Sequence, residues 1–254
     1  MTIRDSVYIT YAGQRSYDKG ILNVNVTGGM YDEPVSGARN VQEDRNMGGE
    51  RFLRNVDEDN LEFDITLYFE DNLSREKVRD ITRWLLQDRH QPLIFNEHPD
   101  RIFYAVAEGS YRLIHNGVQE GYLELSFRCN APHAFSPTYQ SPTFNLTGGR
   151  SVHKVEFENL GDKDVSPILF IHKIGDGDIE IKNLSDNGKI TKIRNLVNNE
   201  RIEIDSANNK IKSNTDLNRY NDFNYEWFNL VYGLNHIEVT GSCNIYYVCQ
   251  FKIY

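Results

Sequence analysis

A run of ten residues, 61–70, alternates strictly between apolar and polar side chains. Its apolar members are Leu61, Phe63, Ile65, Leu67 and Phe69. Successive side chains of a β-strand point to opposite faces, so this run can bury one face and wet the other only as a strand. Residues 121–129 repeat the pattern. The chain is therefore expected to be mostly β.

One helix is expected to interrupt these strands, near residues 74–89. Ser74 is a good N-cap, and Pro92 closes the region. The apolar residues between them recur at helical spacing and are Val78, Ile81, Trp84 and Leu85. Weaker strand candidates are residues 20–27 and 101–107. Residues 1–135 are thus predicted to form a β-sandwich-like domain with one helix.

A proline-rich segment separates this part from the rest of the chain. Pro132, Pro137 and Pro142 lie within eleven residues, which excludes a central strand or a helix there. The basic residues also change identity: residues 1–140 hold 13 Arg and 2 Lys, whereas residues 141–254 hold 4 Arg and 9 Lys. We place the domain boundary near residues 130–147.

The second part consists of short apolar runs broken by turn signals such as Asp186-Asn-Gly. The expected strands are residues 168–174, 179–181, 190–196, 202–204, 237–239 and 243–253. Regularly spaced short strands are typical of a sandwich or jelly roll. A jelly-roll β-sandwich is predicted for residues 145–254.

The net charge and the distribution of basic residues limit the kinds of binding partner. The net charge is −9 and no block of Lys or Arg occurs, which argues against tight binding to nucleic acid or anionic membranes. No apolar run approaches the roughly 20 residues that span a bilayer, and the first residues lack the apolar core of a signal peptide. Cys243 and Cys249 would lie about 20 Å apart on one strand, too far for a disulfide. A protein made in a reducing cytosol is expected.

Motifs that carry chemistry are missing. The seven His residues show no zinc-binding spacing, and neither a phosphate-binding loop nor a Gly-x-Ser-x-Gly nucleophile motif occurs. Residues 97–101 cluster titratable groups, but they fit a turn between strands. Asp176 and Asp178 suggest calcium, yet Asn187 occupies the position where a calcium loop needs Glu. No catalytic, cofactor or metal site is predicted, and Cys129 is expected to be a core thiol.

Two segments remain as candidates for contact with partners. Residues 28–60 are polar and rich in Gly, and are expected to form a loop or a hairpin that extends from the body. Their acidic residues include Glu43, Asp44, Asp57, Glu58 and Asp59. Further on, Tyr225 and Trp227 belong to an aromatic cluster. Such rings stack on sugars when exposed, although core packing is the commoner role.

Several segments together resemble the distal tail protein (Dit) family of bacteriophages with long non-contractile tails. In the first half these are Asp80-Ile-Thr-Arg-Trp-Leu, Pro92-Leu-Ile-Phe, His98-Pro-Asp-Arg-Ile-Phe-Tyr-Ala-Val, Gly121-Tyr-Leu-Glu-Leu-Ser-Phe-Arg-Cys and Ala131-Pro-His-Ala-Phe-Ser. In the second half they are Pro167-Ile-Leu-Phe-Ile, Ile179-Glu-Ile-Lys-Asn, Glu200-Arg-Ile-Glu-Ile-Asp and Gly233-Leu-Asn-His-Ile-Glu-Val. The resemblance covers nearly the whole chain in the right order.

The resemblance implies a ring-forming first domain and a galectin-like second domain. Six copies would form a homo-hexameric hub between the tail tube protein and the tape-measure and tail-tip proteins. DNA would pass through the channel without specific binding, and six copies would carry six times −9, or −54. Residues 31–59 are hypothesised to contribute to the ring or its lumen. The protein would reside in the virion tail tip after assembly in the host cytoplasm.

Two rival functions stay open. The second domain could be an adhesion module that binds host cell-wall glycan through Tyr225 and Trp227. An enzyme such as a cell-wall hydrolase is the other rival, and the lack of a paired-carboxylate, metal or nucleophile pattern weighs against it. The galectin sugar-binding signature is also missing from the sequence, and residues 145–254 leave no room for the long insertion by which some family members hold receptor-binding proteins.

Overall fold

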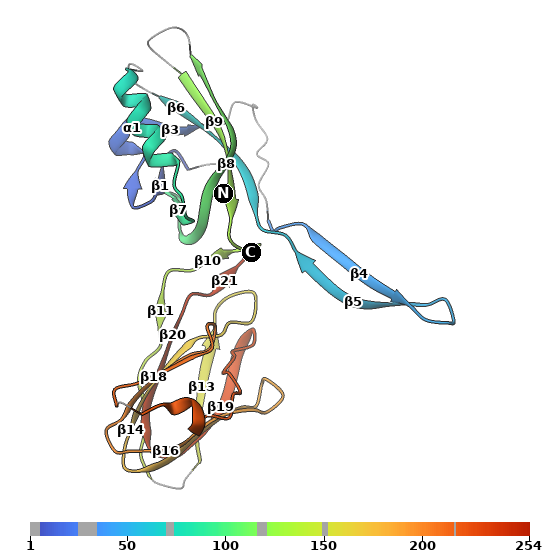
Figure 1. Cartoon of the computed structure of the whole chain (residues 1–254), viewed down its shortest axis with the longest axis vertical. Helices are drawn as coiled ribbons and strands as arrows, with labels where there is room; N and C mark the ends of the chain where they lie inside the picture. Colours follow the sequence, from blue (N-terminus) through green and yellow to red (C-terminus); the bar gives the residue numbers. More distant parts are fainter. Residues whose placement is uncertain (1–5, 25–34, 70–73, 116–120, 149–151, 216) are drawn as a thin grey trace. The chain divides into compact units, whose positions relative to one another are not determined.

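The computed structural model describes residues 6–24, 35–69, 74–115, 121–148, 152–215 and 217–254 (Figure 1). The chain forms two compact units. The first comprises Met1–Phe135 together with Tyr254, and the second comprises Ser136–Ile253. Each unit has its own cluster of buried apolar side chains. Strands dominate both units, so the prediction of a mostly β protein is confirmed.

The first unit is built on one curled antiparallel sheet. Its strands, in order across the sheet, are β2 (Gln14–Arg15), β1 (Ile9–Tyr11), β7 (Gln91–Phe95), β8 (His98–His115), β9 (Gly121–Cys129), β6 (Glu62–Phe69) and β3 (Ile21–Val24). The short β10 (Ala134–Phe135) pairs with β8. The alternating runs become the neighbours β6 and β9, with Ile65 opposite Leu125. Glu70 and residues 25–27, which belong to predicted strands, lie outside the described residues.

Strand β8 is much longer than the predicted strand over residues 101–107. The turn that precedes it needs only Asn96 and Glu97, because Phe95 already pairs with His98. The strand then continues to His115 through a bulge between Glu108 and Arg112. A bulge bends a strand and increases its twist, which lets one long strand follow a curled sheet.

The single α-helix, α1 (Arg75–Leu85), packs its apolar stripe into the core of this sheet. Ser74 Oγ accepts a hydrogen bond from Lys77 N at 3.1 Å, as expected of an N-cap. The helix ends earlier than the predicted residue 89. The Gln87 side chain donates to the carbonyl oxygens of Arg83 and Trp84, both at 3.0 Å. These bonds satisfy the end of the helix and let the chain turn toward β7.

Aromatic side chains fill much of the first core. Tyr11 and Phe127 contact edge to face with ring centroids 5.1 Å apart, and Phe63 and Phe103 do so at 5.5 Å. The indole of Trp84 donates to the carbonyl oxygen of Tyr11 at 2.8 Å. This bond fixes the helix against β1, since a buried indole N–H needs a partner.

The second unit is a β-sandwich of two antiparallel sheets. One sheet is ordered β11 (Tyr139–Gln140) and β12 (Phe144–Leu146), both beside β20 (Cys243–Cys249), then β14 (Ile168–Lys173), β17 (Arg201–Asp205) and β18 (Lys210–Ser213). The other is ordered β13 (Val152–Asn159), β19 (Gly233–Thr240), β15 (Gly177–Asn183) and β16 (Lys189–Leu196). Inward side chains of both sheets share one core.

The predicted last strand, residues 243–253, is divided in two. Alternate residues of β20 are buried, as the sequence predicts, but the strand ends at Cys249 and β21 (Lys252–Ile253) follows. At the break, Phe251 N donates to Ser136 Oγ at 2.8 Å instead of continuing the ladder with a neighbouring strand. A side-chain acceptor thereby interrupts the regular pairing.

A buried ion pair fixes one long connection of the sandwich. Arg219 lies in a short 3₁₀ helix, Arg219–Asp222, and its guanidinium donates to both carboxylate oxygens of Glu200 at 2.7 and 2.6 Å. Its remaining nitrogen reaches Asp222 at 2.9 Å. Such a two-pronged contact fixes both distance and direction. It holds the connection between β18 and β19 against the end of β16.

Candidate functional site: the β4–β5 hairpin

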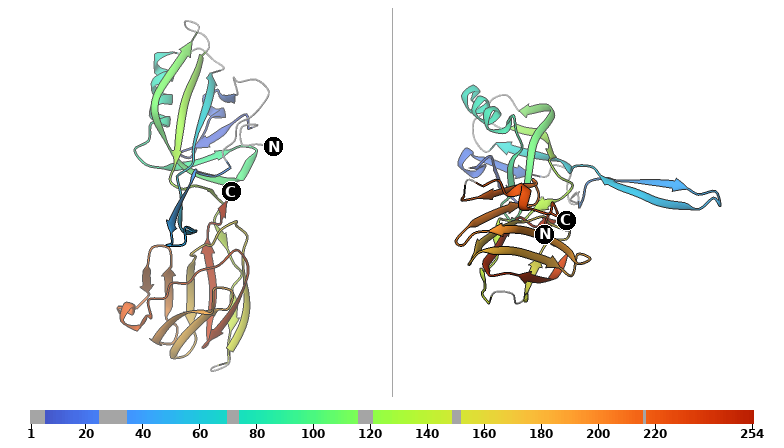
Figure 2. Two further views of the ribbon diagram at one scale, coloured as in Figure 1. Left: turned by 90° about the vertical axis from the view of Figure 1, so that its right-hand side faces the viewer. Right: turned by 60° about the horizontal axis from the view of Figure 1, so that its bottom comes forward.

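Residues 39–58 form a two-stranded hairpin that projects from the first unit (Figures 1 and 2). Its strands are β4 (Arg39–Arg45) and β5 (Arg51–Glu58), and within the part of the chain that the structure describes each pairs only with the other. Of the two alternatives predicted for this region, a loop or a hairpin, the structure therefore has the hairpin. Residues 28–34 of the predicted segment lie outside the described residues.

The tip of the hairpin is a turn shaped by one asparagine. Asn46 Oδ1 accepts from Glu50 N at 2.8 Å, and Gly49 has a φ of 88°. Gly allows this left-handed conformation without a steric penalty. The Gly48-Gly49 pair thus lies in the turn that closes the hairpin.

The base of the hairpin is anchored by backbone hydrogen bonds. Asp59 N donates to Ala38 O at 2.8 Å, and Gly37 N donates to Pro132 O at 3.1 Å. A Cβ atom at Gly37 would lie 1.6 Å from the Asp59 carbonyl oxygen. Only glycine fits where these two chain segments approach so closely.

The five acidic residues proposed for the ring or lumen all lie on this hairpin or at its base, and each has a polar partner. Glu43 pairs with Arg51 at 3.1 Å, Asp44 with Arg54 at 3.8 Å and Glu58 with Arg39 at 3.6 Å. Asp57 accepts from Gln42 at 2.9 Å, and Asp59 accepts from Asn40 at 3.0 Å. Six acidic and four basic residues between positions 35 and 60 leave this segment at a net −2.

One face of the hairpin carries unpartnered apolar side chains. Val41 lies opposite Val56, and Leu53 lies opposite Glu43, so these side chains share one face. Val41 and Leu53 are 58 % and 65 % exposed. On the other face, Phe52 opposite Asp44 is 55 % exposed. An isolated two-stranded hairpin is only marginally stable in water, and exposed apolar groups on such an element indicate a contact surface.

The residues weighed in the sequence as calcium-binding, acid–base or nucleophilic candidates lie in turns and strands. Asp176 Oδ1 accepts from Asn198 N at 2.8 Å, and Asp178 Oδ1 accepts from Asn195 N at 3.1 Å, so both support turns. The turn predicted over residues 97–101 is shorter than expected, because His98, Asp100 and Arg101 already belong to β8. Burial and the nearby Glu62 carboxylate raise the pKa of Cys129 to about 12, which makes it an inert core thiol. Among the described residues, no group of three His, Cys, Asp or Glu could hold a metal ion.

The two aromatic residues proposed for sugar contact have different surroundings. Trp227 packs against the sandwich core, with its ring centroid 4.8 Å from that of Phe223. Tyr225 is 59 % exposed and has a φ of 59°, which is uncommon for a residue other than Gly. Tyr225 therefore presents a ring to solvent, whereas Trp227 mainly completes the core.

Sequence reasoning missed the strand β13 and the Glu200–Arg219 ion pair. The alternation of Val155 and Phe157 with Lys154 and Glu156 was a usable signal for the strand. The ion pair joins residues 19 positions apart in two different connections, and no local pattern predicts such a contact.

Two family descriptions match the chain. Residues 4–131 match a phage tail protein N-terminal domain, and residues 140–249 match a phage tail C-terminal domain. The chain is also similar to the SPbeta prophage-derived uncharacterized protein YomH of Bacillus subtilis strain 168. The two are 32 % identical over 252 residues, which cover 98 % of this chain and 99 % of the relative.

A solved structure has the same fold. The chain is similar to the crystal structure of the Dit protein of SPP1, described as a paradigm of the hub adsorption apparatus in phages that infect Gram-positive bacteria. The TM-score is 0.72 with 16 % identity, over 96 % of this chain and 98 % of that chain. The resemblance predicted from the sequence is confirmed. In the part of the chain that the structure describes, no helix has the length and apolar character needed to cross a membrane.

Proposed function

We propose that this chain, which belongs to the family of phage tail proteins, is a hub that closes into a six-membered ring between the tail tube and the tail tip. Residues 1–135 would form the ring, and residues 145–254 would be a galectin-like domain outside it. The tail tube protein, the tape-measure protein and the tail-tip proteins would be its partners. DNA would cross the channel without specific binding.

The observation that carries this proposal is the β4–β5 hairpin. Its strands pair only with each other, yet it exposes Val41, Leu53 and Phe52. A head-to-tail contact places the same element of each copy on the next copy, and such contacts close into a ring when the rotation permits. We assign the hairpin as the element that contacts the neighbouring copy and covers its apolar groups there.

The charge of the hairpin favours ring contact over a DNA-repelling lumen. Three of its five candidate carboxylates pair with arginines of the same hairpin, and the segment has a net charge of only −2. A surface that must avoid phosphate groups needs unbalanced negative charge. Mixed charges around an apolar strip are instead typical of a protein interface.

Mass photometry of the full-length protein across a range of concentrations tests the ring. We expect a hexamer that forms as concentration rises. The double variant V41E/L53E should lose it, because charged groups would have to be buried in the contact. The control L160E changes a residue that is 60 % exposed in the second unit and should leave the hexamer intact. Absence of a wild-type hexamer at high concentration, or a hexamer in the double variant, would contradict the proposal.

Glycan adhesion remains the alternative, and it rests on Tyr225, the exposed ring of the aromatic cluster. Calorimetric titration of the full-length protein with host cell-wall polysaccharide tests it. Heat of binding that disappears in Tyr225→Ala would favour adhesion. A flat titration would leave the hub without a sugar-binding role.

A further inference from the structure

The four-stranded sheet of the second unit has two edges that differ in how they are covered. At the β16 edge, Asn224 N donates to Lys192 O at 3.1 Å, and the Asn224 side chain bonds Lys192 N and Ile190 O at 3.0 and 2.7 Å. At the opposite edge lies β13, eight residues long, which among the described strands pairs only with β19. Proteins usually cover or blunt such an edge, so a long open one needs an explanation.

The hydrogen bonds of β19 show which groups of β13 face outward. His236 bonds toward β15, because its carbonyl oxygen accepts from Leu184 N at 2.9 Å. The backbone groups of the next residue, Ile237, therefore face β13, where they meet Val155. By the same alternation, the N–H and C=O groups of Lys154 and Glu156 point away from β19. These groups have no hydrogen-bond partner within the described ranges.

The sequence around this edge is complementary to itself. In an antiparallel pair of two β13 strands centred on Val155, Lys154 of each copy lies opposite Glu156 of the other. Both pairs bring unlike charges together, and both use the outward backbone groups. A register centred on Lys154 or on Glu156 instead places two like charges directly opposite each other. The side chains of Lys154 and Glu156 are 80 % and 63 % exposed and are available for this contact.

We propose that β13 is a docking edge for β13 of a second copy of this chain, in antiparallel register centred on Val155. The two four-stranded sheets would join into one continuous sheet. A contact of this kind is two-fold symmetric, unlike the head-to-tail contact of a ring. It is therefore an interface separate from the proposed ring contact.

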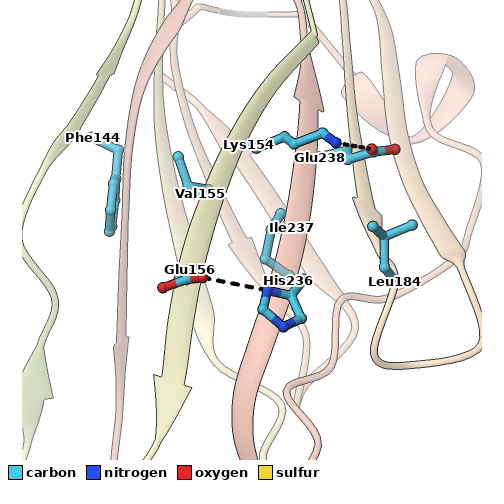
Figure 3. A pocket seen from close by; sticks show the side chains of 8 residues that line it. All are labelled: Phe144, Lys154, Val155, Glu156, Leu184, His236, Ile237 and Glu238. Atoms are coloured by element: carbon cyan, nitrogen blue, oxygen red, sulfur yellow. Dashed lines mark ion pairs between the residues drawn. The ribbon is translucent and has the colours of Figure 1, made fainter.

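A groove beside the edge receives the central side chains. It measures about 660 Å³, and Phe144 and Val155 line it together with the pairs Lys154–Glu238 and Glu156–His236 (Figure 3). The ion pairs measure 3.8 and 3.5 Å. The Val155 side chain of the second copy would lie beside its mate at this groove, next to the ring of Phe144.

A single strand pair is a small contact, so two isolated copies would bind weakly. The strand pairing does not depend on the proposed ring.

Disulfide trapping of the full-length protein tests the pairing. In the proposed register, the two Val155 residues form a pair without mutual backbone hydrogen bonds, with Cα atoms about 4.5 Å apart, which is within disulfide range. Val155→Cys should give a covalent dimer under mild oxidation. In the control Val152→Cys, the two sulfurs would lie about 20 Å apart, at opposite ends of the pair. The three native cysteines are buried and should give no background.

Charge reversal on the V155C background checks the register. K154E and E156K should each lower the yield of covalent dimer severalfold, because each places like charges opposite. The double variant K154E/E156K should restore the yield. An equal yield from V155C and V152C, or no rescue by the double variant, would overturn the proposal. Trapped dimers in the triple variant V41E/L53E/V155C, which lacks the ring contact, would show that the pairing stands even where the ring fails.

Discussion

The hairpin of the first unit and the β18–β19 connection of the second unit both contain arginine–carboxylate pairs, but in opposite surroundings. Arg51 and Glu43 on the hairpin are 72 % and 39 % exposed, whereas Arg219 and Glu200 are almost completely buried. Water and salt weaken the exposed pair. In the buried pair, removal of one partner would leave the other charge buried without a counter-charge. Similar chemistry therefore has different consequences at the two places.

The difference indicates what each region does. The buried pair fixes the β18–β19 connection to its own sandwich, and its charged groups are not exposed to a binding partner. The hairpin has no core of its own, and its ion pairs stabilise it only weakly. Its conformation is therefore expected to depend on contact with another molecule, which agrees with an assembly role.

Glu200→Ala should have the largest effect. It leaves Arg219 buried without its main partner and also removes the acceptor of the Ser213 hydroxyl, which lies 2.6 Å away. We expect a loss of about 3–5 kcal/mol from the free energy of unfolding of the second unit. Urea denaturation followed by tryptophan fluorescence measures it, since Trp227 packs on this core.

The matched control for that variant is Glu203→Ala. It removes the partly exposed partner of Lys212, 2.6 Å away, and should cost less than about 1 kcal/mol. Equal losses in the two variants would show that burial does not distinguish these pairs.

Gly37→Ala should disturb the base of the hairpin. The added Cβ meets the Asp59 carbonyl oxygen, and the backbone must shift to make room. We expect a loss of about 1–3 kcal/mol, as for other overpacked sites, together with faster proteolysis of the hairpin. Gly48→Ala at the tip is the control. Its Cβ would meet nothing closer than 3.4 Å, and its stability and proteolysis rate should match the wild type.

Acid should weaken the buried pair by a smaller amount, because the carboxyl group remains in place. Burial raises the pKa of Glu200, but the hydrogen bonds from Arg219 and Ser213 outweigh it and leave this pKa below the ordinary 4.5. A depressed folded-state pKa contributes stability above the unfolded value, and this contribution is lost as the pH falls through the folded pKa.

The thermal midpoint of the second unit should therefore drop below pH 4.5 more steeply in the wild type than in Glu200→Gln. Calorimetry at pH 3 to 7 follows both proteins. Parallel curves for the two proteins would show that protonation of Glu200 does not cause the drop in thermal midpoint.

Arg51→Ala should have the smallest effect. It removes an exposed pair with Glu43 and should change the free energy of unfolding by less than about 1 kcal/mol. Thermal denaturation of the unassembled protein measures this. A large loss would mean that the hairpin is a stable part of the first unit even without a partner. The exposed pair of the hairpin would then stabilise the fold as the buried Glu200–Arg219 pair does.

Local patterns in the sequence determined much of the fold. The alternation in residues 61–69 and 121–129 predicted β6 and β9, and the spacing of Ile81, Trp84 and Leu85 predicted the buried face of α1. These predictions succeed because the period of apolar residues depends only on backbone geometry. Element ends were less accurate, as at Leu85 and Cys249, since side chains such as those of Gln87 and Ser136 decide where backbone hydrogen bonding stops.

Only the tertiary structure decided which strands are edges and which charges are buried. Nothing local distinguishes β13, open along one side, from β16, whose edge Asn224 covers from 32 positions further along the chain. Likewise, Glu43 and Glu200 look alike in the sequence, but one lies on a solvated hairpin and the other beneath Arg219. The sequence of each segment determines the period of its apolar residues. Residues distant in the chain decide which of its side chains are solvated and which strands it pairs with.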